Sequence, residues 1–182
     1  MPIRSVCVFL GSSRGTDATL TQATEQLGRA IAARGWTLVY GGASVGLMGA
    51  LADATLAAGG KVHGVIPAEM LEREIAHQGL SRLDIVGSMA KRKELMFTAC
   101  DAFITLPGGF GTLDELFEAL TGALLGYHAR PCVLVDLGGY YRDLIRFLDG
   151  AVAAGLIRPQ HRALLEVAPD VESAVNVLAN RA

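Results

Sequence analysis

Short apolar runs alternate along the chain with longer segments whose apolar residues recur at every third or fourth position. The short runs end at glycine, proline or small polar residues, as buried strands often do. They predict seven strands, at residues 5–10, 36–40, 62–66, 83–86, 102–106, 131–135 and 164–167. The longer segments have the period of helices with one apolar face. Asp17 or Thr19 is expected to cap the first helix, and Asp170 the last.

The regular alternation of strands and helices predicts an α/β fold. We expect a Rossmann-like, doubly wound, mostly parallel sheet with helices on both of its faces. The chain shows no linker and no change in composition, so residues 1–182 are expected to form a single domain. Hydrophobic residues make up 51% of the chain and charged residues 19%, which favours a globular protein over a disordered one.

Three glycine-rich clusters follow the first, second and fifth predicted strands. They lie at residues 11–15, 41–46 and 107–112. In open parallel sheets, ligands bind beyond the carboxyl ends of the strands, near the point where the strand order reverses. The three clusters are therefore expected to meet around one ligand.

Residues 106–115 carry the clearest chemical signal. An apolar strand leads into a turn with three glycines, and a helix follows whose predicted inner face carries Leu113, Leu116, Phe117, Leu120 and Leu124. Glycine allows a ligand to approach the backbone, and the first amides of a helix attract anions, most often phosphates. Glu115 lies about one turn into this helix, close enough to act on whatever the phosphate anchors. The alternative is a turn without a ligand, in which the acidic residue only stabilises the helix.

A basic segment precedes the fifth strand. Met89, Arg92, Lys93, Met96 and Cys100 share one face of a predicted helix, and this mostly apolar face is expected to point toward the sheet. Arg92 would then be held near the ligand end of the sheet, where a guanidinium can make bidentate contacts with carboxylate or phosphate. The alternative is that this is a solvated run of charges, in which Lys91 and Lys93 lie in water.

Several classes of protein are not favoured. The first turn lacks the G-x-G-x-x-G spacing of dinucleotide-binding folds, and the chain has no P-loop. A net charge of −2 gives no basic footprint for nucleic acid, and no apolar run is long enough to span a membrane. The odd number of separated cysteines predicts reduced, buried thiols, and the histidines show no metal-ligand spacing. The N-terminus carries no signal pattern, so we expect a cytoplasmic protein.

Residues 107–115 read Pro-Gly-Gly-Phe-Gly-Thr-Leu-Asp-Glu and match the PGGxGTxxE signature of the lonely-guy family. These cytokinin-activating nucleotide phosphoribohydrolases have often been mislabelled as lysine decarboxylases. Nearly the whole chain resembles the family, because further blocks occur in the family's order. They lie at residues 11–13, 40–42, 46–49, 64–67, 92–93 and 139–141.

The resemblance implies hydrolysis of the N-glycosidic bond of N6-modified adenosine 5′-monophosphates, which yields the free base and ribose 5-phosphate. It implies that Arg92 and Glu115 are the catalytic pair, with no metal or redox cofactor. It also implies a set of residues that bind the nucleotide and its phosphate: Ser12, Ser13, Gly42, Met89, Lys93, Gly108, Gly109, Gly111 and Thr112. The partner is then a small nucleoside monophosphate, and the family's homodimer, with the site near the subunit boundary, is implied as well.

The chain departs from the family at two positions. Ala90 stands where the family usually has histidine, and Gly122 stands where tryptophan is common. Both departures concern the choice of base, so prenylated adenine nucleotides and plain AMP remain alternative substrates. The irregular segment at residues 68–81 is long enough to close over the base, and Gln78 is a candidate contact there.

Two other functions remain open from the sequence. The same fold carries nucleotide-like or pterin-type cofactors in the related molybdenum-cofactor carriers, so a binding protein is one alternative. A lysine decarboxylase using pyridoxal phosphate is the other, and it needs a lysine that forms a Schiff base. The chain offers only Lys61, Lys91 and Lys93 for that role.

Overall fold

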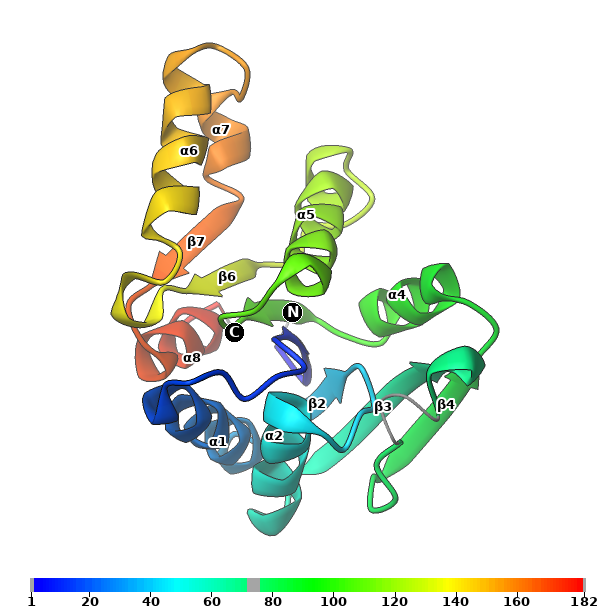
Figure 1. Ribbon diagram of the computed structural model, residues 1–182. Helices are drawn as coiled ribbons and strands as arrows, with labels where there is room; N and C mark the ends of the chain where they lie inside the picture. Colours follow the sequence, from blue (N-terminus) through cyan, green and yellow to red (C-terminus); the bar gives the residue numbers. More distant parts are fainter. Residues whose placement is uncertain (1, 72–75, 182) are drawn as a thin grey trace.

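The computed structural model describes residues 2–71 and 76–181, and it contains one seven-stranded sheet (Figure 1). The strand order is β4-β3-β2-β1-β5-β6-β7, and every pairing between neighbours is parallel. The strands are β1 (Ser5–Phe9), β2 (Thr37–Tyr40), β3 (Lys61–Pro67), β4 (Arg82–Val86), β5 (Ala102–Thr105), β6 (Cys132–Val135) and β7 (Leu165–Ala168). All seven predicted strands are confirmed, and β4 and β7 are the edge strands.

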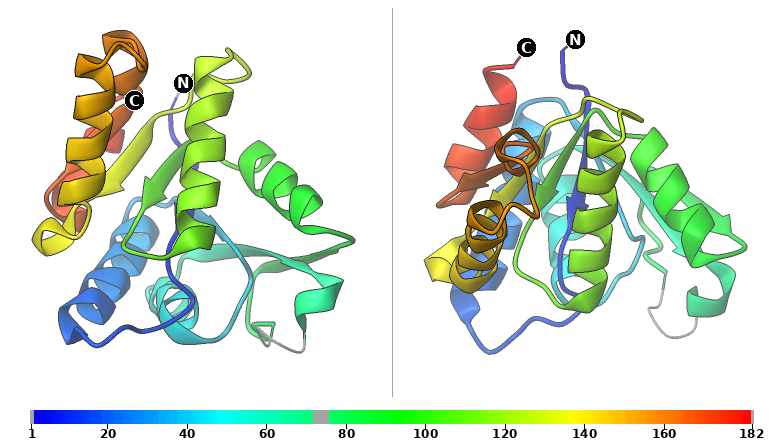
Figure 2. Two further views of the ribbon diagram at one scale, coloured as in Figure 1. Left: turned by 45° about the horizontal axis from the view of Figure 1, so that its top comes forward. Right: turned by 90° about the horizontal axis from the view of Figure 1, so that it is seen from above.

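Helices cover both faces of this sheet, which confirms the predicted fold class (Figures 1 and 2). The α-helices are α1 (Ala18–Ala33), α2 (Gly46–Ala57), α4 (Met89–Thr98), α5 (Phe110–Leu124), α6 (Arg142–Ala153), α7 (Pro159–Arg162) and α8 (Val171–Ala179). Two short 3₁₀ helices are η1 (Ala68–Met70) and η2 (Leu137–Gly139). Helices α1, α2 and α8 pack on one face, and α4, α5 and α6 pack on the other. In the described residues, no helix has the length and apolar character needed to cross a membrane.

The central strand β1 shows how the sequence builds two cores. Its side chains alternate, so Val6 and Val8 face α1, α2 and α8, whereas Cys7 and Phe9 face α4 and α5. All three cysteines are free and buried, as predicted. The predicted caps are also present, because Asp17 accepts a hydrogen bond from the Thr19 N–H at 2.8 Å and Asp170 begins α8.

The strand order places a reversal at the centre of the sheet. The chain starts at β1 and extends outward through β2 and β3 to β4. It then crosses back to place β5 on the other side of β1, where Val8 pairs with Ile104 and Phe9 with Thr105. The loops that follow β1 and β5 therefore diverge at one point, which is where a ligand binds in folds of this kind.

The inner face of α5 agrees with the prediction only in part, because Leu116 is buried and Leu113 and Leu120 pack against the core. Its buried residues are Thr112, Glu115, Leu116 and Ala119, whereas Phe117 and Leu124 are exposed. Apolar periodicity alone missed Thr112 and Glu115, since these two buried positions are polar.

The predicted irregular connection after β3 is partly anchored. It begins with η1, and the backbone of Ala76 forms a bridge with Ala43 beyond β2. The His77 N–H donates to the Gly42 carbonyl at 3.0 Å. The side chain of Gln78 donates to the Ala76 carbonyl at 3.2 Å. Residues 72–75 of this connection lie outside the described residues.

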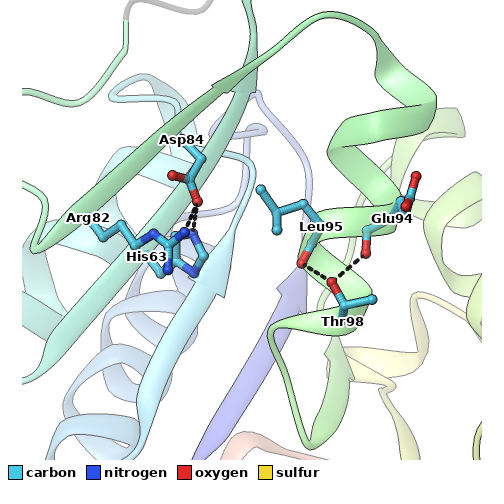
Figure 3. Close-up of polar contacts among 6 residues, drawn as sticks. All are labelled: His63, Arg82, Asp84, Glu94, Leu95 and Thr98. Atoms are coloured by element: carbon cyan, nitrogen blue, oxygen red, sulfur yellow. Dashed lines mark hydrogen bonds and ion pairs between the residues drawn. The ribbon is translucent and has the colours of Figure 1, made fainter.

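A polar cluster ties the edge strand β4 to β3 (Figure 3). The Asp84 carboxylate lies 2.7 Å from His63 Nε2 and 2.8 Å from an Arg82 nitrogen. Burial opposes the charge of Asp84, but the hydrogen bonds from His63 and Arg82 outweigh it and lower the pKa of this carboxyl. On the facing helix α4, the Thr98 hydroxyl donates to the carbonyl of Glu94 at 3.0 Å, one turn earlier (Figure 3).

Close packing of α1 on α2 gives a test of the fold. A Cβ atom added at Gly28 would lie 2.8 Å from the Leu51 carbonyl oxygen and 2.9 Å from Thr55 Oγ1. Gly28→Ala is therefore expected to destabilise the protein by about 1–3 kcal/mol, although alanine favours a helix. The measurement is the free energy of unfolding in urea.

The matched control is Gly150→Ala in α6, where an added Cβ meets nothing within 4 Å. This change is expected to stabilise the protein by up to about 1 kcal/mol, since only helix propensity changes. Equal stabilisation by both substitutions would contradict the packing of α1 against α2.

Candidate functional site

A cavity of about 270 Å³ lies where the loops after β1 and β5 diverge. It is bordered by the loop after β1, the turn before α5, and the first turns of α2, α4 and α5. The residues that line it are Leu10, Gly11, Ser12, Met48, Met70, Met89, Arg92, Gly109, Phe110, Gly111, Thr112, Asp114 and Glu115. The cavity thus brings the first and the last of the three glycine clusters together with Arg92 and Glu115.

The turn before α5 is built as an anion site. Helix α5 begins after Gly109, and no side chain caps its first amides, in contrast to α1, α4 and α8. Because Gly109 and Gly111 line the cavity, this helix end and its partial positive charge face the space where a ligand would lie. Gly108 has no room for a side chain, since an added Cβ would lie 2.1 Å from Thr112 Oγ1. The turn can therefore hold a phosphate on backbone amides and the Thr112 hydroxyl.

Glu115 is the sixth residue of α5, and it lines the same cavity with only 7% of its surface exposed. A carboxylate this close to the helix start lies near any anion held by the turn. Its charge also influences Cys7 in the central strand β1. Burial and the thiol of Cys100 raise the pKa of Cys7, Glu115 raises it further, and Arg92 acts in the opposite direction.

Arg92 projects from α4 into the cavity and is buried, with 3% of its surface exposed. The sequence predicted a position near the ligand end of the sheet, and the side chain lies there. A buried guanidinium needs acceptors, and the strand ends supply them. Its Nε donates to the Val65 carbonyl at 3.1 Å, and its Nη2 donates to the Gly41 carbonyl at 2.9 Å.

Gly41 is required by this arrangement. A Cβ atom at position 41 would lie 1.9 Å from Arg92 Nη2 and 2.6 Å from the terminal methyl of Met48. The glycine after β2 therefore makes room for the guanidinium. Gly42 serves the backbone instead, because its φ is +79° and its carbonyl accepts the His77 N–H.

The structure divides the residues that the sequence singled out. Those that line the cavity are Ser12, Met89, Arg92, Gly109, Gly111, Thr112 and Glu115. Those that do not line it are Ser13, Gly42, Lys93 and Gly108. Gly108 belongs to the turn itself, whereas Lys93 of α4 is paired with Asp114 and Glu118 of α5.

Lys93 joins the two helices through carboxylates. Its Nζ lies 2.8 Å from Asp114 and forms a second ion pair with Glu118, while only 15% of its side chain is exposed. Burial opposes the charge, but the two carboxylates outweigh it and raise the pKa of Lys93. The lysine thereby fixes α4, which carries Arg92, against α5, which carries Glu115.

Several cavity residues were not predicted. They are Leu10, Met48, Met70, Phe110 and Asp114. Phe110 and Asp114 lie inside the glycine motif. Their position next to candidate residues such as Gly111 and Glu115 could have indicated that they line the cavity. Met70 comes from the connection after β3, which the sequence marked only by its length. No local pattern links Met48 and Met70, because they come from two separate elements, α2 and η1.

The two departures from the family pattern lie outside this cavity. Ala90 is exposed in the first turn of α4. Gly122 borders a separate groove of about 770 Å³ between α4 and α5, where a Cβ would lie 3.1 Å from His128 Nε2. The side chains along this groove are mostly apolar and include Phe97, Phe110, Leu113, Phe117, Leu125 and Tyr127. Because Phe110 and Asp114 line both spaces, the groove adjoins the cavity.

The sequence has clear relatives. Residues 48–178 match the protein family described as "Possible lysine decarboxylase". The chain is 46% identical to the probable cytokinin riboside 5′-monophosphate phosphoribohydrolase LOGL9 of Oryza sativa subsp. japonica, over 96% of this chain and 77% of that protein. It is 47% identical to the cytokinin riboside 5′-monophosphate phosphoribohydrolase of Rhodococcoides fascians, over 94% of this chain and 87% of that protein.

Solved structures share the fold. The molybdenum cofactor carrier protein of Chlamydomonas reinhardtii has a TM-score of 0.75 and 23% identity, and the match covers 97% of this chain and 96% of the carrier. The molybdenum cofactor binding protein of Rippkaea orientalis has a TM-score of 0.73 and 22% identity, and the match covers 100% of this chain and 98% of that protein. At these identities the likeness concerns the architecture alone.

The ion pairs of Lys93 give a prediction about stability and pH. The raised pKa means that the charged lysine stabilises the folded state at neutral pH. This contribution is lost as the pH rises above the ordinary lysine value of 10.5 and through the raised one. We expect Lys93→Met to lower the free energy of unfolding by about 1 kcal/mol near neutral pH.

Urea unfolding of both proteins from neutral to strongly alkaline pH measures this difference, which should shrink at the alkaline end. The control is Lys91→Met on the same helix, whose ion pair with Glu94 is largely exposed. It should change the stability by less than about 0.5 kcal/mol. A Lys93 effect that stays constant with pH would contradict the assignment.

Proposed function

This chain belongs to the family of the cytokinin riboside 5′-monophosphate phosphoribohydrolases, and we propose that it hydrolyses the N-glycosidic bond of N6-modified adenosine 5′-monophosphates. The products are the free base and ribose 5-phosphate. One observation carries the proposal: the buried residues Arg92 and Glu115 share a single cavity with an uncapped helix end. This cavity combines a place for a phosphate with a carboxylate that faces the sugar.

The phosphate anchors the substrate in this proposal. The amides at Gly109 and Gly111 and the Thr112 hydroxyl hold the 5′-phosphate, and Ser12 approaches it from the loop after β1. The ribose then extends from the start of α5 toward Glu115, which is on the same helix. Anchoring by the phosphate selects nucleotides over nucleosides and places the glycosidic carbon beside the carboxylate.

Glu115 assists the bond cleavage. When the bond between C1′ and the base nitrogen breaks, its electron pair leaves with the base and positive charge develops on the sugar. The carboxylate stabilises this charge and takes a proton from the attacking water, whose oxygen bonds to C1′. A proton returns to the base nitrogen, so one water molecule is consumed for each base released. Arg92, held by two carbonyls, orients the carboxylate or the substrate.

A decarboxylase is not supported, despite the description of the family. Such an enzyme needs a lysine that forms a Schiff base with pyridoxal phosphate. The three lysines of the chain all lie in the described part, and none lines the cavity. Lys93 is already paired with two carboxylates, and Lys61 and Lys91 are exposed. The carrier alternative is also weaker, because the likeness to the carriers extends only to the fold.

The substitution Glu115→Gln tests the proposed reaction. It keeps the size of the side chain but removes the charge, so base release from isopentenyladenosine monophosphate and from AMP should fall by about 100-fold or more. Chromatography of the products measures free base and ribose 5-phosphate. The rates of base release by the wild type show which of the two nucleotides is the better substrate. Calorimetry on the variant should still detect nucleotide binding.

Undiminished release by Glu115→Gln would contradict the role of the carboxylate. Wild-type protein that releases no base from either nucleotide, but retains a ligand through purification, would favour the carrier.

A homodimer belongs to the same proposal. The groove between α4 and α5 exposes large apolar side chains, and Phe110 is 95% exposed at its edge. A second copy of this chain seated there would cover the groove and border the cavity through Phe110 and Asp114. The proposed partners are thus a nucleoside monophosphate and a second copy, and neither nucleic acid nor a membrane is involved. The proposed location is the cytoplasm, where the three free thiols stay reduced.

The substitution Phe117→Glu tests this interface. A charge in the apolar groove should shift the wild-type dimer toward monomer in sedimentation velocity, and it should lower the turnover because the cavity loses one border. Phe147→Glu on α6 is the control, since Phe147 is exposed outside the groove. A wild-type protein that sediments as a monomer at micromolar concentration would refute the dimer.

A further inference from the structure

Three consecutive carbonyl groups lead into the turn before α5, and each accepts a hydrogen bond. The Leu106 carbonyl accepts from the Tyr141 hydroxyl at 2.9 Å, and the Pro107 carbonyl accepts from the Gly11 N–H at 3.2 Å. The Gly108 carbonyl accepts from the Tyr140 hydroxyl at 2.9 Å. Two of the three donors are adjacent tyrosines that lie 32 and 35 residues further along the chain.

These bonds fix the orientation of the peptide units in the turn, including the unit that carries the Gly109 N–H. A trans peptide unit is planar, so its C=O and N–H point in opposite directions. Holding the Gly108 carbonyl on Tyr140 therefore turns the Gly109 N–H away from that tyrosine. Gly109 lines the cavity and neither tyrosine does, so this amide is directed to the ligand side. The same bonds turn negative carbonyl dipoles away from the place of an anion.

The local sequence is built to present the two phenols side by side. Gly138 and Gly139 both have positive φ, +58° and +80°, which only glycine adopts readily. The Tyr141 N–H donates to the Asp136 carboxylate at 2.6 Å, and this bond closes the turn. The two rings meet edge to face with centroids 4.8 Å apart, so each limits the movement of the other.

The two tyrosines differ in burial, but the hydroxyl of each donates a hydrogen bond to a carbonyl of the turn. Tyr141 is 3% exposed and packs beside Leu116 and Leu148, whereas Tyr140 is 57% exposed. Burial raises the pKa of Tyr141, so its hydroxyl keeps the proton that it donates. Phenylalanine at either position would retain the ring contact and remove only the hydrogen bond to the turn.

We propose that Tyr140 and Tyr141 are positioning residues that orient the turn at residues 106–109, so that the Gly109 amide and the start of α5 that follows it bind the phosphate of a nucleoside monophosphate. The proposal rests on the proposed function for the identity of the ligand, but it concerns binding and not bond cleavage. The tyrosines act through the backbone and do not touch the nucleotide. Removal of their hydroxyl groups therefore weakens binding of the phosphate and leaves the contacts to the nucleoside unchanged.

The experiment compares AMP with adenosine, which lacks the phosphate. Calorimetry on proteins that also carry Glu115→Gln prevents turnover during the titration. Tyr140→Phe and Tyr141→Phe should each weaken AMP binding by roughly three- to tenfold, the range for one lost hydrogen bond. The affinity for adenosine should not change. In the active protein, the same substitutions should raise KM for AMP more than they lower kcat.

Tyr40→Phe is the matched control. Its hydroxyl also donates to a backbone carbonyl, that of Ala43 at 3.0 Å, and it is buried. This change should lower the melting temperature without changing the affinity for AMP, which separates positioning from general destabilisation.

Two results would overturn the proposal. One is an equal loss of affinity for AMP and adenosine in the Tyr140→Phe and Tyr141→Phe variants, or no loss at all. The other is wild-type binding of AMP that is no tighter than that of adenosine. Failure of the wild type to hydrolyse both AMP and isopentenyladenosine monophosphate would instead count against the proposed function, because the binding comparison does not depend on turnover.

Discussion

The buried guanidinium of Arg92 is the interaction on which the site depends. A charge with 3% of its residue surface exposed is costly to remove from water, and it persists only where acceptors compensate for the loss. The carbonyls of Val65 and Gly41 are such acceptors, and both lie at the carboxyl ends of strands. A single side chain on α4 is thereby fixed to β2 and β3. The absence of a side chain at Gly41 follows from this constraint, because any Cβ there would collide with the guanidinium.

The second half of the site is fixed by strand order. Since β5 returns to lie beside β1, the turn at residues 107–112 opens next to the loop after β1. Lys93 then holds α4 against α5 through Asp114 and Glu118, so the arginine and Glu115 border one cavity. The molybdenum cofactor carriers have the same architecture at 22–23% identity. The architecture alone therefore does not determine the chemistry, which depends on the side chains around the site.

The sequence was sufficient to predict the strands, the parallel sheet and the meeting of glycine clusters with Arg92 and Glu115, since these depend on local patterns and on chain reversal. It predicted the inner face of α5 only in part, because Phe117 follows the apolar period but remains exposed, while the polar Thr112 and Glu115 are buried. It also did not reveal that Lys93 bridges two helices. Such contacts join residues that are distant in the sequence, so no local pattern predicts them. The same holds for Met70, which lines the cavity, and for Tyr140, which donates to the Gly108 carbonyl.

The most direct test of the central claim is a crystal structure of the Glu115→Gln protein with AMP. The account predicts that the phosphate lies on the amides at Gly109 and Gly111, with the ribose extending toward position 115 and Arg92 still bound to the Gly41 carbonyl. A nucleotide bound in the groove between α4 and α5, or with its phosphate away from the start of α5, would contradict it.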